Sequence, residues 1–158
     1  MDMKIRKATI KDLKEIQRLN LLLFEKEYEE YDKYLDLNWT FGKKGTKAFK
    51  DVLIDQDKCA FVAEINGEIV GYLAGGISTG ENYRHLPPVA ELYNTLVLEE
   101  YRGESIGTEL YNEFAKWCKK KKFKVIKVQT SAPNKKAIKF YHKNGFKDYT
   151  LILENYLD

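Results

Sequence analysis

The sequence predicts a single α/β (α+β) domain in which helices pack on a mixed central β-sheet. The chain has 158 residues, which fits one domain of the usual ~100–200 residues. Hydrophobic residues make up 44% and charged residues 32% of it, as in chains that fold around an apolar core. Strand-like and helix-like periodicities alternate in the order strand, helices, three strands, helix, strand, helix, strand.

The first third of the chain predicts one short strand and two helices. Residues 4–8 alternate between polar and apolar side chains, which indicates a strand. Thr9 can cap a helix N-terminus, and Asp12 would lie at the positive end of its dipole. Apolar residues at three- and four-residue spacing carry this helix to about Glu30, and a shorter helix follows near residues 46–54.

Three strands are expected next. Residues 59–65 and 68–77 are largely apolar and flank Asn66-Gly67. Such a dipeptide predicts a two-residue hairpin turn, because both central residues of a type I′ turn need a positive φ. Residues 89–98 form the third strand candidate, after a loop.

The last third predicts two helices and two strands. A helix is expected over residues 104–121 and a strand over residues 124–130. Asn134 then opens a helix that ends at Gly145, a residue suited to a left-handed C-cap. Residues 146–153 read as a last strand or hairpin.

Composition excludes several classes of protein. The two cysteines, Cys59 and Cys118, cannot form a disulfide framework or a four-ligand zinc site, and we expect both in the core. No apolar run approaches the ~20 residues of a membrane span. The charged start lacks the apolar run of a secretory signal. We therefore expect a soluble, cytoplasmic protein.

Charge is unevenly distributed along the chain. Residues 1–100 carry 14 basic and 18 acidic side chains, net −4, and residues 101–158 carry 13 and 6, net +7. The asymmetry fits a cationic partner for the front and a polyanion for the back, or two solvated surfaces without function. Lys119–Lys122 could bind nucleic acid, but we interpret this run as a solvated face that complements a helix dipole.

A candidate phosphate site lies between a strand and a helix, at Arg102-Gly103-Glu104-Ser105-Ile106-Gly107. Unpaired backbone amides and the positive end of the dipole make a helix N-terminus suitable for phosphate. Glycines allow close approach to the backbone. An ordinary strand-to-helix turn is the alternative, because the segment matches neither the NTPase loop nor the dinucleotide-binding pattern.

The same segment belongs to a wider resemblance. Residues 96–108 resemble the acetyl-CoA-binding motif of the GNAT N-acetyltransferases, Gln/Arg-x-x-Gly-x-Gly/Ala, with Arg102 first and Ser105 in place of a glycine. Residues 134–146 resemble the second motif of that family, Asn…Ala…Phe-Tyr…Gly-Phe. The likeness implies a GNAT fold for the single domain 1–158.

The resemblance covers nearly the whole chain. Residues 5–13 and the hairpin 65–72 are also typical of the family, whereas about residues 25–55 and 78–88 are unmatched. The family uses acetyl-CoA as its acyl donor, and we expect no metal. Contact with this cosubstrate is implied for Val97, Leu98, Arg102, Gly103, Glu104, Ser105, Ile106, Gly107, Thr108, Asn134 and Tyr141.

Tyr141 and Glu91 are the candidate catalytic residues. The family places a tyrosine at the position of Tyr141 as general acid, and a phenol with a reference pKa of about 10 is protonated at neutral pH. Spacing alone favours a core residue, because Tyr141 shares an apolar stripe with Ala137 and Ile138. The resemblance makes Glu91 a possible base for the amine, with a water chain as the alternative. His85 and His142 are expected at the surface.

The resemblance implies transfer of an acetyl group to an amine of a small molecule or peptide. We expect the acceptor groove between the acidic residues 25–36 and the loop 78–88, which would favour a cationic amine. We expect no membrane partner. The sequence leaves both a monomer and a homodimer open. The alternative function is a CoA-binding sensor without turnover, which Ser105 favours because it replaces a motif glycine, and Glu104 because it adds a negative charge nearby.

Overall fold

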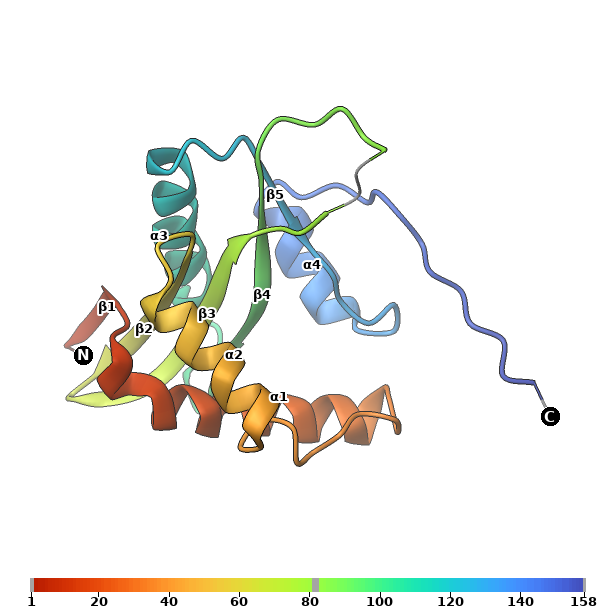
Figure 1. Ribbon diagram of the computed structural model, residues 1–158. Coiled ribbons are helices and arrows are strands. Elements are labelled where there is room, and N and C mark those ends of the chain that lie inside the picture. The colour runs from red at the N-terminus through yellow and green to blue at the C-terminus, as the bar shows by residue number, and fades with distance from the viewer. Residues whose placement is uncertain (1, 81–82, 158) are drawn as a thin grey trace.

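The structure, a computed structural model, describes residues 2–80 and 83–157. One five-stranded sheet, in the order β1-β2-β3-β4-β5, lies between helices on its two faces (Figure 1). The elements are β1 (Met3–Lys7), a 3-10 turn (Ile10–Asp12), α1 (Leu13–Glu30), α2 (Lys43–Ile54), β2 (Lys58–Ile65), β3 (Glu68–Ile77), β4 (Val89–Val97), a 3-10 turn (Glu99–Tyr101), α3 (Ile106–Lys120), β5 (Val125–Val128) and α4 (Lys135–Lys143).

The sheet is mixed, as the sequence predicts. Strands β1 to β4 pair antiparallel to their neighbours, and the expected Asn66-Gly67 turn joins β2 to β3 with positive φ at both residues. Strand β5 returns parallel to β4 after the crossover through α3. Expected and observed element ends agree within a few residues.

Two apolar layers hold the helices to the sheet. Side chains on one face of β2 and β3, such as Val62 and Tyr72, pack against α1 and α2. Side chains on the other face, such as Phe61 and Leu73, pack against α3 and α4. Successive strand residues therefore enter opposite layers, and this explains why the middle of β3 is an uninterrupted apolar run.

The sheet opens between β4 and β5. Their parallel pairing covers only Val89↔Val125 to Leu92↔Val128, while β4 stays paired with β3 as far as Val97. Between Leu92 and Val97, β4 therefore has no strand on its β5 side within the described chain. The two strands separate into a cleft at their carboxyl ends, a common ligand position in parallel sheets.

One expected element is absent. Residues 146–153 are not a strand, and the described chain from residue 146 to residue 157 forms neither helix nor strand. Figure 1 shows this segment leaving the body beside β5 and α4 as a tail. Its sequence is strand-like, but a strand needs a partner strand for its hydrogen bonds, and within the described chain this segment pairs with none.

No helix in the described ranges is long and apolar enough to cross a membrane.

Candidate active site

A cavity of about 980 Å³ fills the opening between β4 and β5. Its walls come from five places: α1, the end of β4, the turn into α3, the segment after β5, and α4. Of the eleven residues expected at the cosubstrate, nine line this cavity, and Leu98 and Glu104 do not. The two family-like segments, 96–108 and 134–146, therefore meet on one site although they are separate in the sequence.

The N-terminus of α3 forms one end of the cavity. Gly103 and Ser105 both have positive φ, +82° and +64°, so the turn is tight enough to direct successive amides to one side. The side chain of Ser105 does not cap α3 within the described chain. A Cβ on Gly107 would come within 3.3 Å of the Phe140 ring, so glycine allows α3 and α4 to approach closely.

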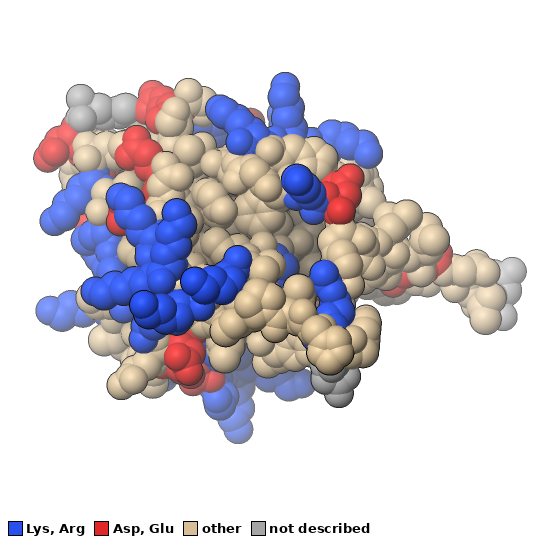
Figure 2. Space-filling model, turned by 90° about the horizontal axis from the view of Figure 1, so that it is seen from above, with Lys and Arg blue, Asp and Glu red and all other residues tan. Residues whose placement is uncertain are grey.

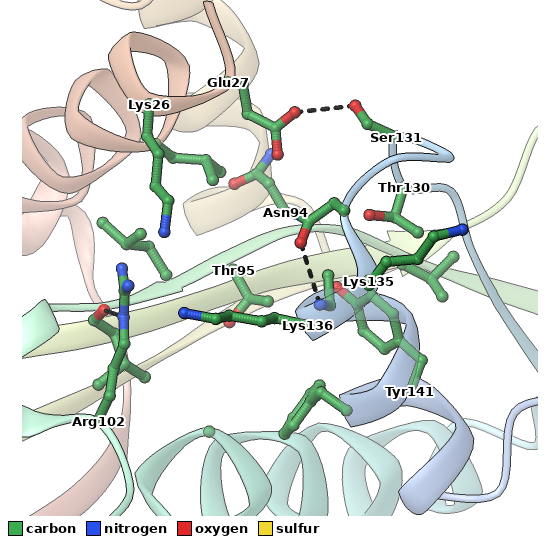
Figure 3. Close-up of a pocket in the computed structure, with 18 of the residues that line it drawn as sticks. Lys26, Glu27, Asn94, Thr95, Arg102, Thr130, Ser131, Lys135, Lys136 and Tyr141 are labelled. Carbon is green, nitrogen blue, oxygen red and sulfur yellow. Dashed lines mark hydrogen bonds between the residues drawn. The ribbon is translucent and has the colours of Figure 1, made fainter. Parts of the chain in front are cut away.

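Three cationic side chains converge on this end of the cavity. Figure 3 shows Lys26 from α1, Lys136 from α4 and Arg102 from the turn directed toward one region. The Nε of Arg102 donates to the Val97 carbonyl at 2.9 Å, which fixes the guanidinium beside the end of β4. Like charges that face one space repel each other, so this region is suited to a ligand with several negative charges.

The two expected contacts at the end of β4 differ in availability. Val97 lines the cavity, and its carbonyl already accepts from Arg102. The amide of Leu98 donates to the Val70 carbonyl at 2.9 Å, and its side chain packs in the core. Leu98 therefore continues the pairing with β3, and the main chain of β4 at Val97 and before it is the open edge.

Tyr141 lies deep in the cavity wall. Its side chain projects from α4, is 9% exposed, and packs against Phe140 and Phe146 at ring distances of 5.4 and 5.5 Å. Burial, with a smaller contribution from the negative charge of Glu27, raises the pKa of Tyr141 to about 12. The phenol is thus neutral at physiological pH and can donate its proton into the cavity.

Asn134 positions the start of α4. Its side-chain oxygen accepts from the Ala137 amide at 3.1 Å, which is an N-cap hydrogen bond. Asn134 also lines the cavity, so the same residue begins the helix and faces the cleft.

The other end of the cavity is polar and acidic. Glu27 accepts from the Ser131 hydroxyl at 2.9 Å, a contact that joins α1 to the segment after β5 across the cleft (Figure 3). Asn94 lies in the wall of the cavity, where its side-chain oxygen accepts from the buried Tyr72 hydroxyl at 2.6 Å. That bond leaves the amide hydrogens of Asn94 as the donors available to the cavity.

Glu91 lies outside the cavity lining. Its carboxylate is 4.0 Å from the Lys127 ammonium of β5. Ala74 of β3 pairs with Asn94 of β4, whereas the next residue, Gly75, pairs with Leu92. Tyr93 is therefore an extra residue on β4, and it interrupts the alternation of faces between Glu91 and the later residues of the strand.

Other residues singled out in the sequence also lie away from the cavity. His85 and His142 are exposed, and His142 contacts Asp148 at 2.6 Å. Cys59 and Cys118 are buried core residues, as expected. None of the described residues of the loop 78–88 lines the cavity, and Glu81 and Asn82 of that loop lie outside the described residues.

The lysine run at the end of α3 is an exposed surface. Lys119–Lys122 project there, and Figure 2 shows a gathering of basic side chains over this end of the helix. None of them lines the cavity. Acidic side chains lie among them in the same view.

Sequence reasoning missed several cavity residues, among them Asn94, Ser131 and Lys136. Lys26 and Glu27 belong to residues 25–36, which were expected along the acceptor groove, but neither side chain was singled out for a role there. Asn94 and Ser131 follow no local pattern.

Comparison with known proteins defines the class of this protein. The family model described as the Acetyltransferase (GNAT) family matches residues 13–146. An uncharacterized N-acetyltransferase of Methanocaldococcus jannaschii is 31% identical over 149 residues, which are 94% of this chain and 62% of that protein. An N-alpha-acetyltransferase of Sulfurisphaera tokodaii is 29% identical over 98% of this chain and 86% of its own.

Solved structures agree in fold. A protein from Bacillus halodurans superimposes with a TM-score of 0.84 at 20% identity, covering 98% of this chain and 99% of its own. An aminoglycoside acetyltransferase in complex with a CoA bisubstrate analogue gives a TM-score of 0.76 at 18% identity, covering 100% and 99%.

This chain belongs to the GNAT family of acetyltransferases. It is an N-acetyltransferase, and the donor that its family uses is acetyl-CoA. The expected family, fold class and enzyme class are thereby confirmed, and the acceptor is not given by these comparisons.

Proposed function

We propose that this N-acetyltransferase moves an acetyl group from acetyl-CoA directly to a cationic primary amine held in the cleft between β4 and β5. One observation carries the proposal: a single cavity joins a cationic helix N-terminus to a buried neutral phenol and a carboxylate. The first can hold the phosphates of the donor, the second can serve the leaving sulfur, and the third can hold the acceptor.

The donor end fits a nucleotide thioester. The amides at the start of α3 would bind the diphosphate, and Arg102, Lys26 and Lys136 would neutralise the phosphates of CoA. The open edge of β4 near Val97 would pair with the amide groups of the pantetheine arm, as an added strand would. Asn134 would lie beside that arm.

The chemistry requires attack of a neutral amine on the thioester carbonyl carbon. A C–N bond forms, the C–S bond breaks, and Tyr141 gives its proton to the departing sulfur. The ammonium loses one proton before attack, and its nitrogen loses a second one afterwards, which balances the proton on the thiol. The second proton that the nitrogen loses returns to the tyrosinate, so Tyr141 is neutral again for the next turnover.

Water is the better candidate for the proton acceptor. Glu91 lies outside the cavity lining, beside Lys127. The sequence leaves two candidates for the base, Glu91 and a water chain. The position of Glu91 favours the water chain. Holding amine and thioester together in one site supplies much of the rate, because it removes the entropy of bringing them together.

We propose a cationic acceptor because Glu27 and Glu30 both line the cavity, and Glu27 lies beside Ser131, away from Arg102 (Figure 3). A carboxylate attracts an ammonium group and holds it until it is deprotonated. The relatives whose names state an acceptor, an N-alpha-acetyltransferase and an aminoglycoside acetyltransferase, also act on amines. Peptide N-termini and aminoglycosides are therefore the first classes to test.

The test is a thiol-release assay with acetyl-CoA and a panel of peptides, polyamines, aminoglycosides and amino acids, with mass spectrometry of the product. We expect release and an added acetyl group with at least one cationic amine, and a large loss of rate with Tyr141→Phe. CoA-dependent thermal stabilisation without thiol release across the panel would instead indicate a CoA sensor.

A further inference from the structure

A chain of buried polar side chains ends at the cavity, at Asn94 of β4. The Thr40 hydroxyl donates to the side-chain oxygen of Asn20 at 2.7 Å, and the Asn20 amide donates to the Tyr72 hydroxyl at 3.0 Å. The Tyr72 hydroxyl in turn donates to the side-chain oxygen of Asn94 at 2.6 Å. Thr40, Asn20 and Tyr72 are fully buried. The chain therefore connects the segment between α1 and α2 with the cleft, through the core.

The direction of this chain fixes the orientation of the Asn94 side chain. A hydroxyl has one hydrogen, and Tyr72 gives that hydrogen to Asn94 while its oxygen accepts from Asn20. Turning the Asn94 amide over would leave the buried Tyr72 hydroxyl without an acceptor, which is unfavourable. Among the described residues, the amide nitrogen of Asn94 makes no hydrogen bond. Asn94 therefore keeps its oxygen toward Tyr72 and its amide hydrogens free for a ligand.

Asn94 faces the side of the sheet on which Glu27 lies. Asn94 and Leu96 are two residues apart on β4 and point to the same face, and Leu96 packs in the layer beneath α1 and α2. Asn20 and Glu27 share one face of α1, about 10.5 Å apart along the helix axis. Figure 3 shows Asn94 in the same part of the cavity as Glu27, away from Arg102. A ligand at this end would meet a carboxylate from α1 and an amide from β4.

These two groups are complementary to an amine that has an oxygen close to its nitrogen. A carboxylate binds an ammonium group, whereas an amide hydrogen binds an oxygen. A carbonyl oxygen only accepts hydrogen bonds, so it matches a group that offers only donors. Polyamines and simple alkylamines have no such oxygen, and they would leave the amide hydrogens of Asn94 without a partner in the ligand.

We propose that Asn94 is a specificity-determining residue that donates a hydrogen bond to a carbonyl oxygen of the acceptor while Glu27 holds the amine. The acceptor is then an aminoacyl-type amine, in which the carbon that bears the nitrogen is bonded to a carbonyl group. Tyr72 is a positioning residue that acts through Asn94, because it gives the amide a single orientation before the acceptor arrives. The inference rests on the proposed function and narrows its acceptor class.

The experiment compares leucinamide with 3-methylbutylamine, which has the same branched chain without the carboxamide. Thiol release gives kcat/KM for each acceptor with the native protein and with Asn94→Asp. The new carboxylate can still accept from Tyr72 but offers no donor, so we expect kcat/KM for leucinamide to fall ~10-fold or more. We expect no fall for 3-methylbutylamine, because the added negative charge attracts its ammonium group. Comparing variant and native protein on the same acceptor cancels the difference between the pKa values of the two amines.

Asn112→Asp on α3 is the matched control, because it makes the same chemical change at an exposed position outside the cavity lining. We expect both acceptors to stay within ~2-fold of their native kcat/KM. Equal effects of Asn94→Asp on the two acceptors would overturn the proposal. An absence of thiol release with every amine tested would contradict the proposed function itself, and this inference with it.

Tyr72→Phe tests the positioning role. Without the hydroxyl, the Asn94 side chain can turn over, so we expect kcat/KM to fall more for leucinamide than for 3-methylbutylamine. Thermal unfolding reports separately the loss of stability that comes from the unpaired Asn20 amide. A variant that lowers both rates equally would make Tyr72 a structural residue only.

A second measurement does not depend on any variant. It is a crystal structure of the native protein with CoA and leucinamide. We expect the leucinamide carbonyl oxygen within ~3 Å of the Asn94 side-chain nitrogen, and the leucinamide nitrogen beside the Glu27 carboxylate. A carbonyl oxygen bound elsewhere, or an Asn94 amide that contacts only CoA, would overturn the proposal.

Discussion

Burial gives Tyr141 its chemical character. The ring of Tyr141 packs against Phe140 and Phe146, and the negative charge of Glu27 lies close to it. Both the burial and this charge disfavour the phenolate, so the side chain stays a neutral phenol. The sequence leaves two interpretations open for Tyr141, a core residue and a proton donor. The structure makes the two interpretations compatible. The residue is a wall of the apolar core whose hydroxyl faces the cleft.

Tyr141→Phe tests the role of that hydroxyl. The variant keeps the ring and its packing, so we expect CoA affinity to change less than ~2-fold while the single-turnover rate falls ~100-fold or more, the usual contribution of a general acid. Stopped-flow thiol release at several pH values measures the rate, and calorimetry measures CoA binding. Equal single-turnover rates for variant and parent would remove Tyr141 from the chemistry.

Glu27→Gln and Glu91→Gln form a matched pair. The first removes a charge from the cavity but keeps an acceptor for Ser131, so we expect KM for a cationic amine to rise about tenfold, equivalent to about 1.4 kcal/mol. The second removes a charge outside the cavity lining, and we expect kcat/KM to stay within ~2-fold. Steady-state kinetics with the best acceptor measures both.

The reverse pattern would be informative. A loss of kcat in Glu91→Gln that is recovered at high pH would make Glu91 the base, in place of water. An unchanged KM in Glu27→Gln would place the acceptor elsewhere in the cleft.

At the scale of elements, the turn into α3 shows what a departure from the family motif costs. Ser105 stands where the family has a glycine, and it adopts φ +64°. A side chain is strained in this left-handed region, by about 1 kcal/mol or more, whereas glycine is not. The position therefore demands a left-handed residue, and serine meets that demand at a cost in stability.

Ser105→Gly and Ser105→Val test this account. Glycine relieves the strain but adds freedom to the unfolded chain, so we expect the free energy of unfolding to rise by no more than about 1 kcal/mol. Valine, branched at Cβ, should lower it by about 1–2 kcal/mol. Urea unfolding measures the free energy of unfolding of both variants. Equal destabilisation by glycine and valine would show that residue 105 does not adopt the left-handed conformation.

The entry into α1 depends on one ion-pair network. Asp12 is largely buried and accepts two hydrogen bonds from Arg6 and one from the Thr9 amide, while Arg6 also contacts Glu64. The hydrogen bonds from Arg6 lower the pKa of Asp12 below the ordinary value of an aspartate. Its contribution to stability is therefore complete above pH ~4 and is lost as the pH falls through the lowered pKa.

Asp12→Asn should lower the free energy of unfolding at pH 7 by about 1–3 kcal/mol, because it leaves Arg6 with one carboxylate fewer in a half-buried site. The matched control Glu15→Gln removes an exposed partner of Arg18 and should cost less than about 0.5 kcal/mol. Denaturant titration at pH 7 compares them. A similar cost for both would show that the Asp12 network contributes little.

Elements could be predicted from the sequence wherever local pattern and tertiary context agree. The hairpin turn at Asn66-Gly67 could be predicted from local sequence alone, because both residues have positive φ and Asn and Gly adopt such values readily. The strand expected over residues 146–153 was wrong, because a strand pattern also needs a partner strand, and within the described chain this segment pairs with none.

At the scale of the whole molecule, the sequence indicates most of the cavity residues in the proposed donor half of the site and few of those in the proposed acceptor half. The donor half consists of backbone geometry at a strand-to-helix turn, which leaves a local sequence signature. The acceptor half is assembled from α1, the bulged part of β4 and the segment after β5. These side chains meet only in the folded chain, and the register shift on β4 changes which of them face the cleft.

Three buried or partly buried tyrosines couple the stability of the whole domain to alkaline pH. Burial raises the pKa of Tyr72, Tyr93 and Tyr141 above the ordinary value of a tyrosine, to about 12 for Tyr93 and Tyr141. A tyrosine whose pKa is higher in the folded than in the unfolded protein makes its full contribution to stability below pH ~10. That contribution is lost as the pH rises towards 12. We therefore expect the unfolding free energy to be level up to about pH 10 and then to fall.

Urea unfolding at pH 8, 9, 10 and 11 measures this dependence. Tyr141→Phe should reduce the alkaline slope, because it removes one of the groups. A slope that begins below pH 9 would point to other titrating groups.

The most direct test of the whole account is a crystal structure of the protein with bound CoA. We expect the diphosphate within ~3 Å of backbone amides between Gly103 and Thr108, the pantetheine arm along the open edge of β4, and the sulfur beside the Tyr141 hydroxyl. A ligand that occupies another surface, or a sulfur that lies far from Tyr141, would contradict it.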